Sequence, residues 1–294
     1  MTLNHKFCII MVVKNEEKHI SEAIVSALCK SNAVIYLIDD NSTDNTLAIV
    51  SELSESFIGR IAWHRNHGIG KVDAYRNIEN LPKSDFYLFL DGDDFFSDEW
   101  VDFDDPLDLK SLYYYDLKLF YSRGKIKLMP SPAIHAMDHM SLMQSLILLP
   151  KASWVVPRDM IYEYLRIPDG VEFEDIWFSL ISYKRAIEIQ KLNWRWYMYR
   201  QHENQEWGSQ SLKGRDILKF RTQLIVNSLE AISRERSEFS SVLIEPLRRY
   251  RILNSMSPMN ILMKLGVREY VLFILKTRYP GFLMMIKRNL RSRT

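Results

Sequence analysis

Short apolar runs alternate with longer amphipathic segments along the first hundred residues of the chain. The amphipathic segments, Glu16–Cys29 and Thr43–Leu53, carry their apolar residues at helical spacing. The apolar runs have the length of buried strands, and they are Phe7–Val13, Ala33–Ile38, Arg60–Trp63 and Phe86–Leu90. Strands that alternate with helices are typical of an α/β fold, in which crossover helices cover the faces of a mostly parallel sheet.

The pattern changes after Asp105-Pro106. Residues 111–128 predict a hairpin that turns at Arg123-Gly124, and five prolines interrupt residues 130–168. From about Leu212 onward, apolar residues again recur at helical spacing. We therefore expect a second, more irregular half of the α/β region, followed by a helical region.

Two regions follow from these patterns. We expect an α/β region over residues 1–210, with halves 1–105 and 106–210, and a C-terminal helical region over 211–294. Residues 241–294 hold 11 Lys or Arg against two acids, although the whole chain has a net charge of only +2. The C-terminal region is therefore predicted to be strongly basic.

Composition restricts the class of protein. With 294 residues, 47% of them hydrophobic, the chain can bury a large core. Cys8 and Cys29 stand in apolar segments without metal-ligand spacing, so we expect two buried thiols in a reducing compartment. We find no secretory cleavage pattern and no run near the roughly 18 apolar residues of a membrane span. A cytoplasmic globular protein is expected, with no nucleic-acid partner.

The stretch "DFYLFLDGDDFF" places three acids, Asp91, Asp93 and Asp94, directly after a buried strand. Ligands of such sheets bind beyond the carboxyl ends of the strands. Repulsion between three carboxylates is costly unless a cation or hydrogen bonds relieve it. We favour a divalent cation, Mg²⁺ or Mn²⁺, held by oxygen ligands and shared with a substrate diphosphate.

Three alternatives explain the same acids. The first is a solvated acidic turn. The second is a calcium loop, although the order of ligands that such a loop needs is missing. The third is a phosphatase of the haloacid dehalogenase type, whose Asp-x-Asp normally ends the first strand, whereas here it ends about the fourth.

Five segments together resemble the inverting family 2 glycosyltransferases of GT-A fold that build bacterial surface polysaccharides and lipooligosaccharides. They stand in the family's order over about residues 6–205: "VVKNEEKHISEAI", "IDDNSTDNT", "GIGKVDAYRN", "FLDGDD" and "RIPDGVEFEDIWF". The resemblance implies a catalytic domain at 1–210, with a nucleotide-binding half at 1–105 and an acceptor-binding half at 106–210. Residues 211–294 would be a C-terminal helical extension.

The resemblance assigns roles in nucleotide binding. It implies that Asp40 faces the nucleobase with Asp39 beside it, and that Glu16 lies at the edge of the nucleotide. An alternative is that Asp39 or Asp44 caps the next helix. Lys71 and Arg76 are expected to pair with the base or the diphosphate, although ordinary helix-surface charge explains them equally well.

The resemblance also assigns metal ligands and a catalytic base. Asp91 is expected to meet the ribose or a metal-bound water, and Asp93 to ligate the metal, which neutralises the departing nucleoside diphosphate. Asp175 would deprotonate the acceptor hydroxyl, with Glu174 orienting it; the alternative is a capped helix start. His202 is assigned to the metal and donor phosphates, although a lone histidine is more often structural.

The implied function is metal-dependent inverting transfer of a sugar from a nucleoside diphosphate sugar, expected to be a UDP-sugar. The acceptor would be a hydroxyl of a glycan or a lipid-linked acceptor. The alternative is a non-catalytic sugar-nucleotide-binding or scaffold protein of the same fold. Retention of both Asp91/Asp93 and Glu174/Asp175 argues against it, because a binder needs no base.

The basic C-terminal segment adds a prediction about location. Its alternation of apolar and basic residues predicts a surface that lies on anionic lipid, which would make the protein peripheral at the inner face of the cytoplasmic membrane. The alternative is that these helices pack on the catalytic domain or on a second subunit, as in a homodimer.

Overall fold

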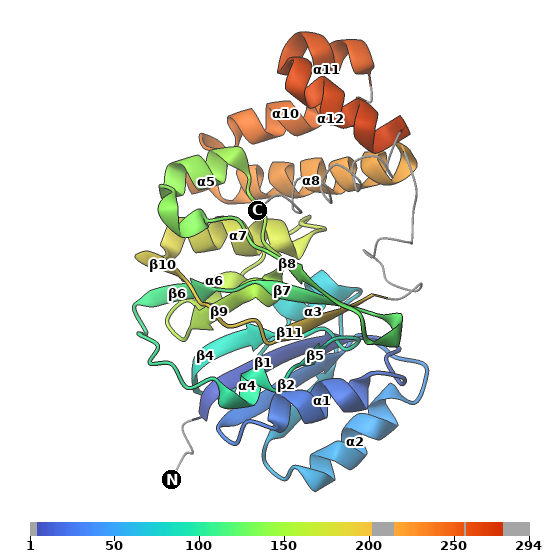
Figure 1. Ribbon diagram of the computed structural model, residues 1–294, viewed down its shortest axis with the longest axis vertical. Helices are drawn as coiled ribbons and strands as arrows, with labels where there is room; N and C mark the ends of the chain where they lie inside the picture. Colours follow the sequence, from blue (N-terminus) through green and yellow to red (C-terminus); the bar gives the residue numbers. More distant parts are fainter. Residues whose placement is uncertain (1–4, 202–214, 256, 279–294) are drawn as a thin grey trace. The chain divides into compact units, whose positions relative to one another are not determined.

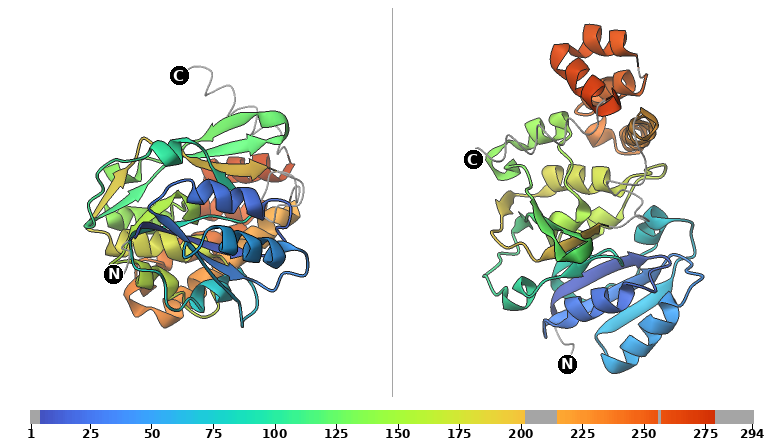
Figure 2. Two further views of the ribbon diagram at one scale, coloured as in Figure 1. Left: turned by 90° about the horizontal axis from the view of Figure 1, so that it is seen from below. Right: turned by 45° about the vertical axis from the view of Figure 1, so that its right-hand side comes forward.

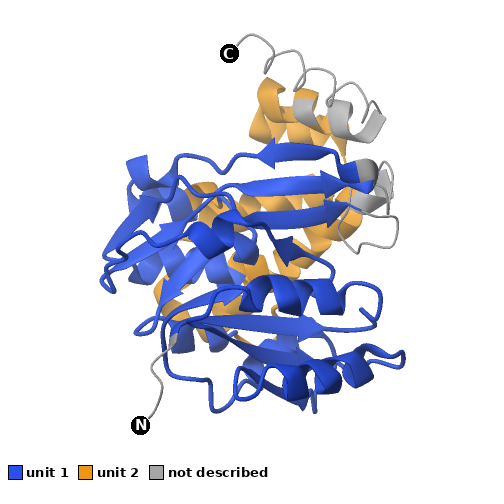
Figure 3. Cartoon of the chain, turned by 60° about the horizontal axis from the view of Figure 1, so that its bottom comes forward, with its two compact units in different colours: residues 1–143, 147–167, 177–201 blue, residues 144–146, 168–176, 202–294 orange. Residues whose placement is uncertain are grey.

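The computed structural model describes residues 5–201, 215–255 and 257–278. The chain forms two compact units (Figure 3). Unit 1 comprises residues 1–143, 147–167 and 177–201, and unit 2 comprises residues 144–146, 168–176 and 202–294. The short segment 168–176 therefore belongs with the helical C-terminal part of the chain.

The larger sheet of unit 1 has seven strands in the order β10-β6-β9-β4-β1-β2-β3 (Figure 1). The strands are β1 (His5–Val13), β2 (Ala33–Asp39), β3 (Ile61–Arg65), β4 (Ser84–Phe89), β6 (Ser111–Tyr114), β9 (Trp154–Pro157) and β10 (Glu188–Lys191). Neighbours pair in parallel except at β9, which is antiparallel to both β4 and β6. The strand order reverses at β1 and β4, where sheets of this kind bind ligands.

A second sheet of unit 1 has the order β5-β11-β7-β8. Its strands are β5 (Phe95–Phe96), β7 (Leu117–Tyr121), β8 (Ile126–Met129) and β11 (Tyr197–Gln201). The predicted hairpin exists between β7 and β8, which are joined by the 3₁₀ turn η1 (Ser122–Gly124). Its expected beginning is wrong, because Ser111–Tyr114 is β6 and pairs in the larger sheet.

The helices of unit 1 are short. They are α1 (Ile20–Leu28), α2 (Thr46–Ser56), α3 (Lys71–Arg76), α4 (Glu99–Asp102) and α6 (Ile161–Leu165), with 3₁₀ turns η2 (Ile134–Ala136) and η3 (Lys151–Ser153). The helices α5 (His139–Ser145) and α7 (Glu174–Arg185) contain residues of both units. The helices α1 and α2 pack against each other on one side of the sheet (Figures 1 and 2).

Two expectations near α1 are corrected. The helix begins at Ile20 and not at Glu16, because the backbone N–H groups of Glu16 and Glu17 donate to the side chains of Thr46, the first residue of α2, and Asp44, in the loop before it. The Cys8 thiol is buried in β1 as expected, but Cys29 is exposed. It stands directly after the last residue of α1, outside the buried stripe of that helix.

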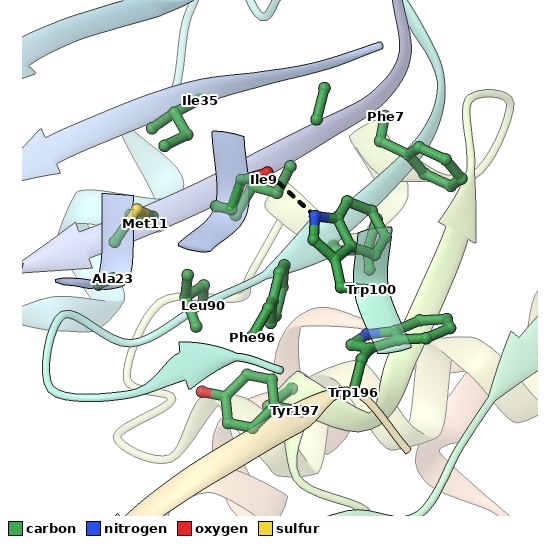
Figure 4. Close-up of a cluster of buried hydrophobic side chains, with 14 of the residues drawn as sticks. Phe7, Ile9, Met11, Ala23, Ile35, Leu90, Phe96, Trp100, Trp196 and Tyr197 are labelled. Atoms are coloured by element: carbon green, nitrogen blue, oxygen red, sulfur yellow. Dashed lines mark hydrogen bonds between the residues drawn. The ribbon is translucent and has the colours of Figure 1, made fainter. Parts of the chain in front are cut away.

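Aromatic side chains fill the core between β1 and the second sheet (Figure 4). Phe96, Trp100 and Trp196 are buried, and the ring of Trp100 contacts the rings of both Phe96 and Trp196. The indole N–H of Trp100 donates to the carbonyl of Ala27 in α1 at 3.0 Å, which satisfies its one donor. Tyr197 packs on Phe96, and its hydroxyl donates to Asp94 in the loop after β4. The aromatic core thus supports the loop after β4 and the start of β11.

Unit 2 is helical in its described part. Its helices are α8 (Arg215–Glu235), α9 (Ser237–Ser240), α10 (Ile244–Asn254), α11 (Pro258–Leu265) and α12 (Val267–Arg278). Ile261 and Phe273 form a small buried cluster with residues of α8 and α10. The Ser257 hydroxyl accepts from the N–H of Asn260 and begins α11. None of the helices in residues 5–201, 215–255 and 257–278 has the length and apolarity that a membrane crossing needs.

Candidate active site

The loop after β4 brings Asp91, Asp93 and Asp94 to the edge of the sheet where β1 and β2 also end. Gly92 allows this loop to lie against β1. A Cβ atom at position 92 would come within 2.8 Å of the Glu16 Cγ atom and 3.0 Å of the Val13 Cγ1 atom. The glycine between the acids is therefore explained by close packing, because any side chain there would displace Glu16.

The Asp91 carboxylate lies between two lysine ammonium groups. Lys71 Nζ is 2.7 Å from Oδ1, and Lys151 Nζ is 2.9 Å from Oδ1 and 2.7 Å from Oδ2. Lys71 begins α3, and Lys151 begins η3. Burial acts to raise the pKa of Asp91, but the two ammonium groups outweigh it and hold that pKa well below its ordinary value. Asp91, Lys71 and Lys151 thus form an ion-pair triad.

Asp94 fastens the loop to β11. The carboxylate is fully buried and accepts from the Tyr197 hydroxyl at 2.6 Å and from the backbone N–H of Arg200 at 2.7 Å. The same hydroxyl accepts from the backbone N–H of Asp91 at 3.3 Å. Burial and the charges of Asp93 and Asp91 raise the pKa of Asp94 well above its ordinary value. Its contacts give Asp94 a structural role.

Arg200 holds the backbone of the second acid. Its Nε donates to the carbonyl of Asp93 at 2.7 Å, and its Nη2 is 2.5 Å from Glu22 Oε2 in α1. The guanidinium carbon also lies over the rings of Phe95 and Phe120, at 5.0 and 5.4 Å. The main chain of Asp93 is therefore fixed by Arg200. The residue itself is half-buried.

Glu16 completes the acidic cluster. Burial, followed by the charges of Asp93 and Asp91, raises its pKa to about 8. Its backbone N–H donates to Thr46 Oγ1 at 2.7 Å, which ties the end of β1 to the start of α2. Glu16 thus follows the end of β1 and lies beside Gly92; its place at the edge of a nucleotide site stays a prediction.

Asp39 and Asp40 lie buried at the end of β2. The carboxylate of Asp39 accepts from the backbone N–H of Ser42 at 3.1 and 3.2 Å, so it closes a turn and does not cap α2. Asp40 Oδ1 accepts from the Asn66 side chain at 2.8 Å and from the backbone N–H of Gly70 at 3.2 Å. Asp40 therefore joins the ends of β2 and β3 to the loop before α3.

The donor set fits a magnesium or manganese ion. Among the described residues, no group of three or more His, Cys, Asp or Glu side chains is arranged as a metal cage. These ions normally take only one or two protein carboxylates and complete their coordination with water and substrate phosphates. Asp93 carries such a carboxylate, and its charge is, after burial, the largest cause of the raised pKa of Glu16. A cation held at Asp93 would lower that pKa.

The other predicted residues are Glu174, Asp175, His202 and Arg76. Glu174 and Asp175 lie in the first turn of α7 and belong to unit 2. The N-terminal end of a helix favours negative charge, so both acids stabilise the start of α7. His202 lies outside the described residues. Arg76, a second basic residue of α3, pairs with Asp73 at 2.7 Å and donates to the carbonyl of Ile167. Arg76 is thus explained by packing.

Sequence reasoning missed Lys151, Asn66, Tyr197 and Arg200. Lys151 stands 60 residues from its partner Asp91, and Tyr197 stands 103 residues from Asp94. Local patterns carry no signal for such pairs. The aromatic stretch "RWYMYRQ" was an available hint, because it predicts a strand just before His202, which is itself predicted to meet the donor phosphates.

Comparison with known proteins gives a sequence match over part of the chain. Residues 8–102 match the model of the family described as Glycosyl transferase family 2. A stretch of 107 residues is 30% identical to the poly(ribitol-phosphate) beta-glucosyltransferase of Bacillus spizizenii. That stretch covers 33% of this chain and 17% of the relative, so the chain corresponds to a minor part of that protein's length.

Solved structures are similar over nearly the whole chain. A structure of S. aureus TarS in complex with UDP-GlcNAc has a TM-score of 0.55 and 19% identity, and covers 92% of this chain and 81% of that one. A mannosyltransferase from Pyrobaculum calidifontis in complex with GDP-Man and Mn²⁺ has a TM-score of 0.51 and 11% identity, with coverages of 99% and 83%. At these identities the likeness is one of fold, and it confirms the predicted GT-A architecture.

Proposed function

We propose that this chain, whose residues 8–102 form a glycosyl transferase family 2 domain, transfers a sugar from a nucleoside diphosphate sugar to a hydroxyl group with inversion at the anomeric carbon. One observation carries the proposal. Within that domain, Glu16, Asp40, Lys71, Asp91 and Asp93 all lie at the edge of the sheet where β1, β2 and β4 end. A sheet of this topology binds nucleotides at that edge.

The donor is proposed to be a UDP-sugar bound by residues of unit 1. In the proposal Asp39 and Asp40 face the base, Glu16 lies at the nucleotide's edge, and Lys71 and Asp91 stand near the ribose and diphosphate. The complex of TarS with UDP-GlcNAc supports uracil as the base. The mannosyltransferase complex with GDP-Man makes guanine the competing base. The acceptor is proposed to be a glycan or a lipid-linked acceptor of a bacterial surface polymer, as the name of the Bacillus relative suggests.

The chemistry is proposed to need one base and one cation. Asp175 takes the proton of the acceptor hydroxyl, and Glu174 orients Asp175 or the acceptor. The acceptor oxygen then bonds to the anomeric carbon while the bond from that carbon to the diphosphate oxygen breaks. Asp93, with His202, would hold Mn²⁺ or Mg²⁺, which supplies positive charge for the departing nucleoside diphosphate.

A panel of nucleotide sugars tests the function. With Mn²⁺ present, we expect one UDP-sugar to raise the thermal midpoint of the protein and to release UDP in a coupled assay, slowly with water and faster with acceptor. GDP- and dTDP-sugars serve as controls. Stabilisation without any release of nucleoside diphosphate would support the non-catalytic alternative. If no nucleotide sugar has either effect, the proposed function is wrong.

We also propose that α11 and α12 attach the protein to anionic membrane at its cytoplasmic face. Met259 and Met263 on α11, and Val267 and Val271 on α12, are exposed at i, i+4 spacing. Their helices also carry exposed basic residues, Lys264 and Arg268, and each basic residue near anionic lipid contributes about 1 kcal/mol. An apolar stripe beside basic charge is the composition of an interfacial helix.

Liposome sedimentation tests this attachment. We expect binding to vesicles that contain anionic lipid, weaker binding at high salt, and loss of binding when Met263→Glu and Val267→Glu are combined. Ile58→Glu, at an equally exposed apolar residue of unit 1, is the control and should bind normally. Equal binding to neutral vesicles would reject a membrane role. So would a double variant that binds vesicles normally but no longer associates with a second copy of the chain.

A further inference from the structure

One face of the second sheet of unit 1 leads from the loop after β4 to the strand β8. The strands β11, β7 and β8 are neighbours in this sheet (Figure 1). Their register pairs Tyr199 with Leu119, and Leu119 with Lys127. Paired residues point to the same side of a sheet. The three residues therefore form a row across the face, and two strand spacings make that row about 10 Å long.

The inner end of the row lies at the candidate active site. Tyr197 stands two residues before Tyr199 and so points to the same face, and its hydroxyl donates to Asp94 at 2.6 Å. Burial, followed by the charges of Asp94 and the other two acids of that loop, raises the pKa of Tyr199. The row thus begins beside the acids that follow β4.

The outer end of the row is basic. Residues 117–137 contain four Lys or Arg residues and no Asp or Glu. Lys118 pairs with Glu99, on the other face of the sheet. Lys125 has extended backbone and stands two residues before Lys127, so the two side chains share the face of the row. Both are exposed, and within the described residues neither forms an ion pair.

We propose that this face binds the acceptor, and that the acceptor carries a phosphodiester or carboxylate group about 10 Å from the hydroxyl that receives the sugar. Lys125 and Lys127 bind that group as point charges. The half-buried rings of Tyr121 and Tyr199 also lie on this face, and their hydroxyls suit the hydroxyl groups of a sugar or polyol. The inference rests on the proposed sugar transfer and adds the charge of the acceptor and the place where that charge binds.

The length of the row makes an anionic acceptor compatible with the acidic loop after β4. Coulomb energy falls with distance, and salt screens charges that lie about 8–10 Å apart or farther. An anionic group in contact with Lys125 and Lys127 is therefore attracted more strongly than the distant acids repel it. A neutral acceptor would gain nothing from either lysine.

Two lysines at the opposite edge of the larger sheet provide a matched control. Lys83 and Lys110 are exposed and directly precede β4 and β6. These two strands run in the same direction, because each is antiparallel to β9. Both lysines therefore lie at the edge where strands begin, away from the loop after β4. Replacing them removes the same charge from the protein as replacing Lys125 and Lys127.

Calorimetric titration of the intact chain with a glycerol phosphate trimer, and separately with trigalacturonate, tests the inference. We expect wild type to bind at least one trimer, and more weakly at high salt. Lys125→Gln combined with Lys127→Gln should weaken that binding about tenfold, the worth of two exposed ion pairs. Lys83→Gln combined with Lys110→Gln should stay within about twofold of wild type. Affinity for UDP should be unchanged in both double variants.

Failure of the inference differs from failure of the proposed function. If wild type binds neither trimer, or the Lys125/Lys127 variant binds as tightly as wild type, the inference is wrong, even when a nucleotide sugar is turned over. If no nucleotide sugar is turned over, trimer binding at the lysines would leave an anion site and reject its role in acceptor binding. Loss of binding to anionic vesicles in place of the trimers would assign the two lysines to lipid and overturn the acceptor site.

Discussion

Asp175→Asn is expected to lower the rate of sugar transfer at saturating donor by roughly 10²–10⁴-fold, the usual contribution of a general base. The amide cannot accept the proton of the acceptor hydroxyl, although it nearly preserves the volume and shape of the carboxylate. Affinity for the nucleotide should change little, because in the proposal Asp175 acts on the acceptor hydroxyl and makes no contact with the nucleotide. The measurements are single-turnover transfer and calorimetric titration with UDP.

Glu172→Gln is the matched control for Asp175→Asn. Glu172 is an exposed acid three residues earlier in the same segment, and its carboxylate accepts from the side chain of Asn227. Its replacement should leave transfer within about twofold of wild type, as is usual for surface substitutions. If Asp175→Asn instead abolishes UDP binding while the rate at saturation survives, Asp175 is a binding residue and the base lies elsewhere.

The strands of unit 1 were predictable where burial on both faces imposes a continuous apolar run. The predicted strands at Phe7–Val13, Ala33–Ile38 and Phe86–Leu90 lie within two residues of β1, β2 and β4. Arg60–Trp63 was predicted too early, because β3 is an edge strand whose residues Ala62 and Trp63 face solvent, so its pattern is weak. Strands β6 and β9 were not predicted in the larger sheet, since their pairing depends on distant segments.

The residues of the candidate site also differ in how far local sequence could predict them. Acids that directly follow a strand were predictable, because a parallel sheet brings the carboxyl ends of its strands to one edge. The charges that balance those acids were not, because an isolated lysine such as Lys151 resembles any surface lysine until the fold buries it. Asp94 shows the converse. In the sequence it stands in the same acidic cluster as Asp91 and Asp93, whereas in the structure its carboxylate accepts from the Tyr197 hydroxyl and the Arg200 backbone N–H.

Asp93→Asn is expected to reduce sugar transfer on the order of 10³-fold, because a bound cation stabilises the departing nucleoside diphosphate by several kcal/mol. The asparagine oxygen is a weaker ligand without charge. The protein should fold normally, since the backbone carbonyl of Asp93 keeps its bond from Arg200 Nε. Binding of Mn²⁺, followed by its electron paramagnetic resonance signal, should be lost in the same variant. Excess chelator should reproduce the loss of transfer in wild type.

Asp85→Asn is the control at the opposite end of β4, where Asp85 pairs with an exposed Arg158 at 3.3 Å. It should retain both transfer and Mn²⁺ binding, since surface ion pairs contribute about 1 kcal/mol or less. Full turnover of wild type in excess chelator would reject the metal mechanism.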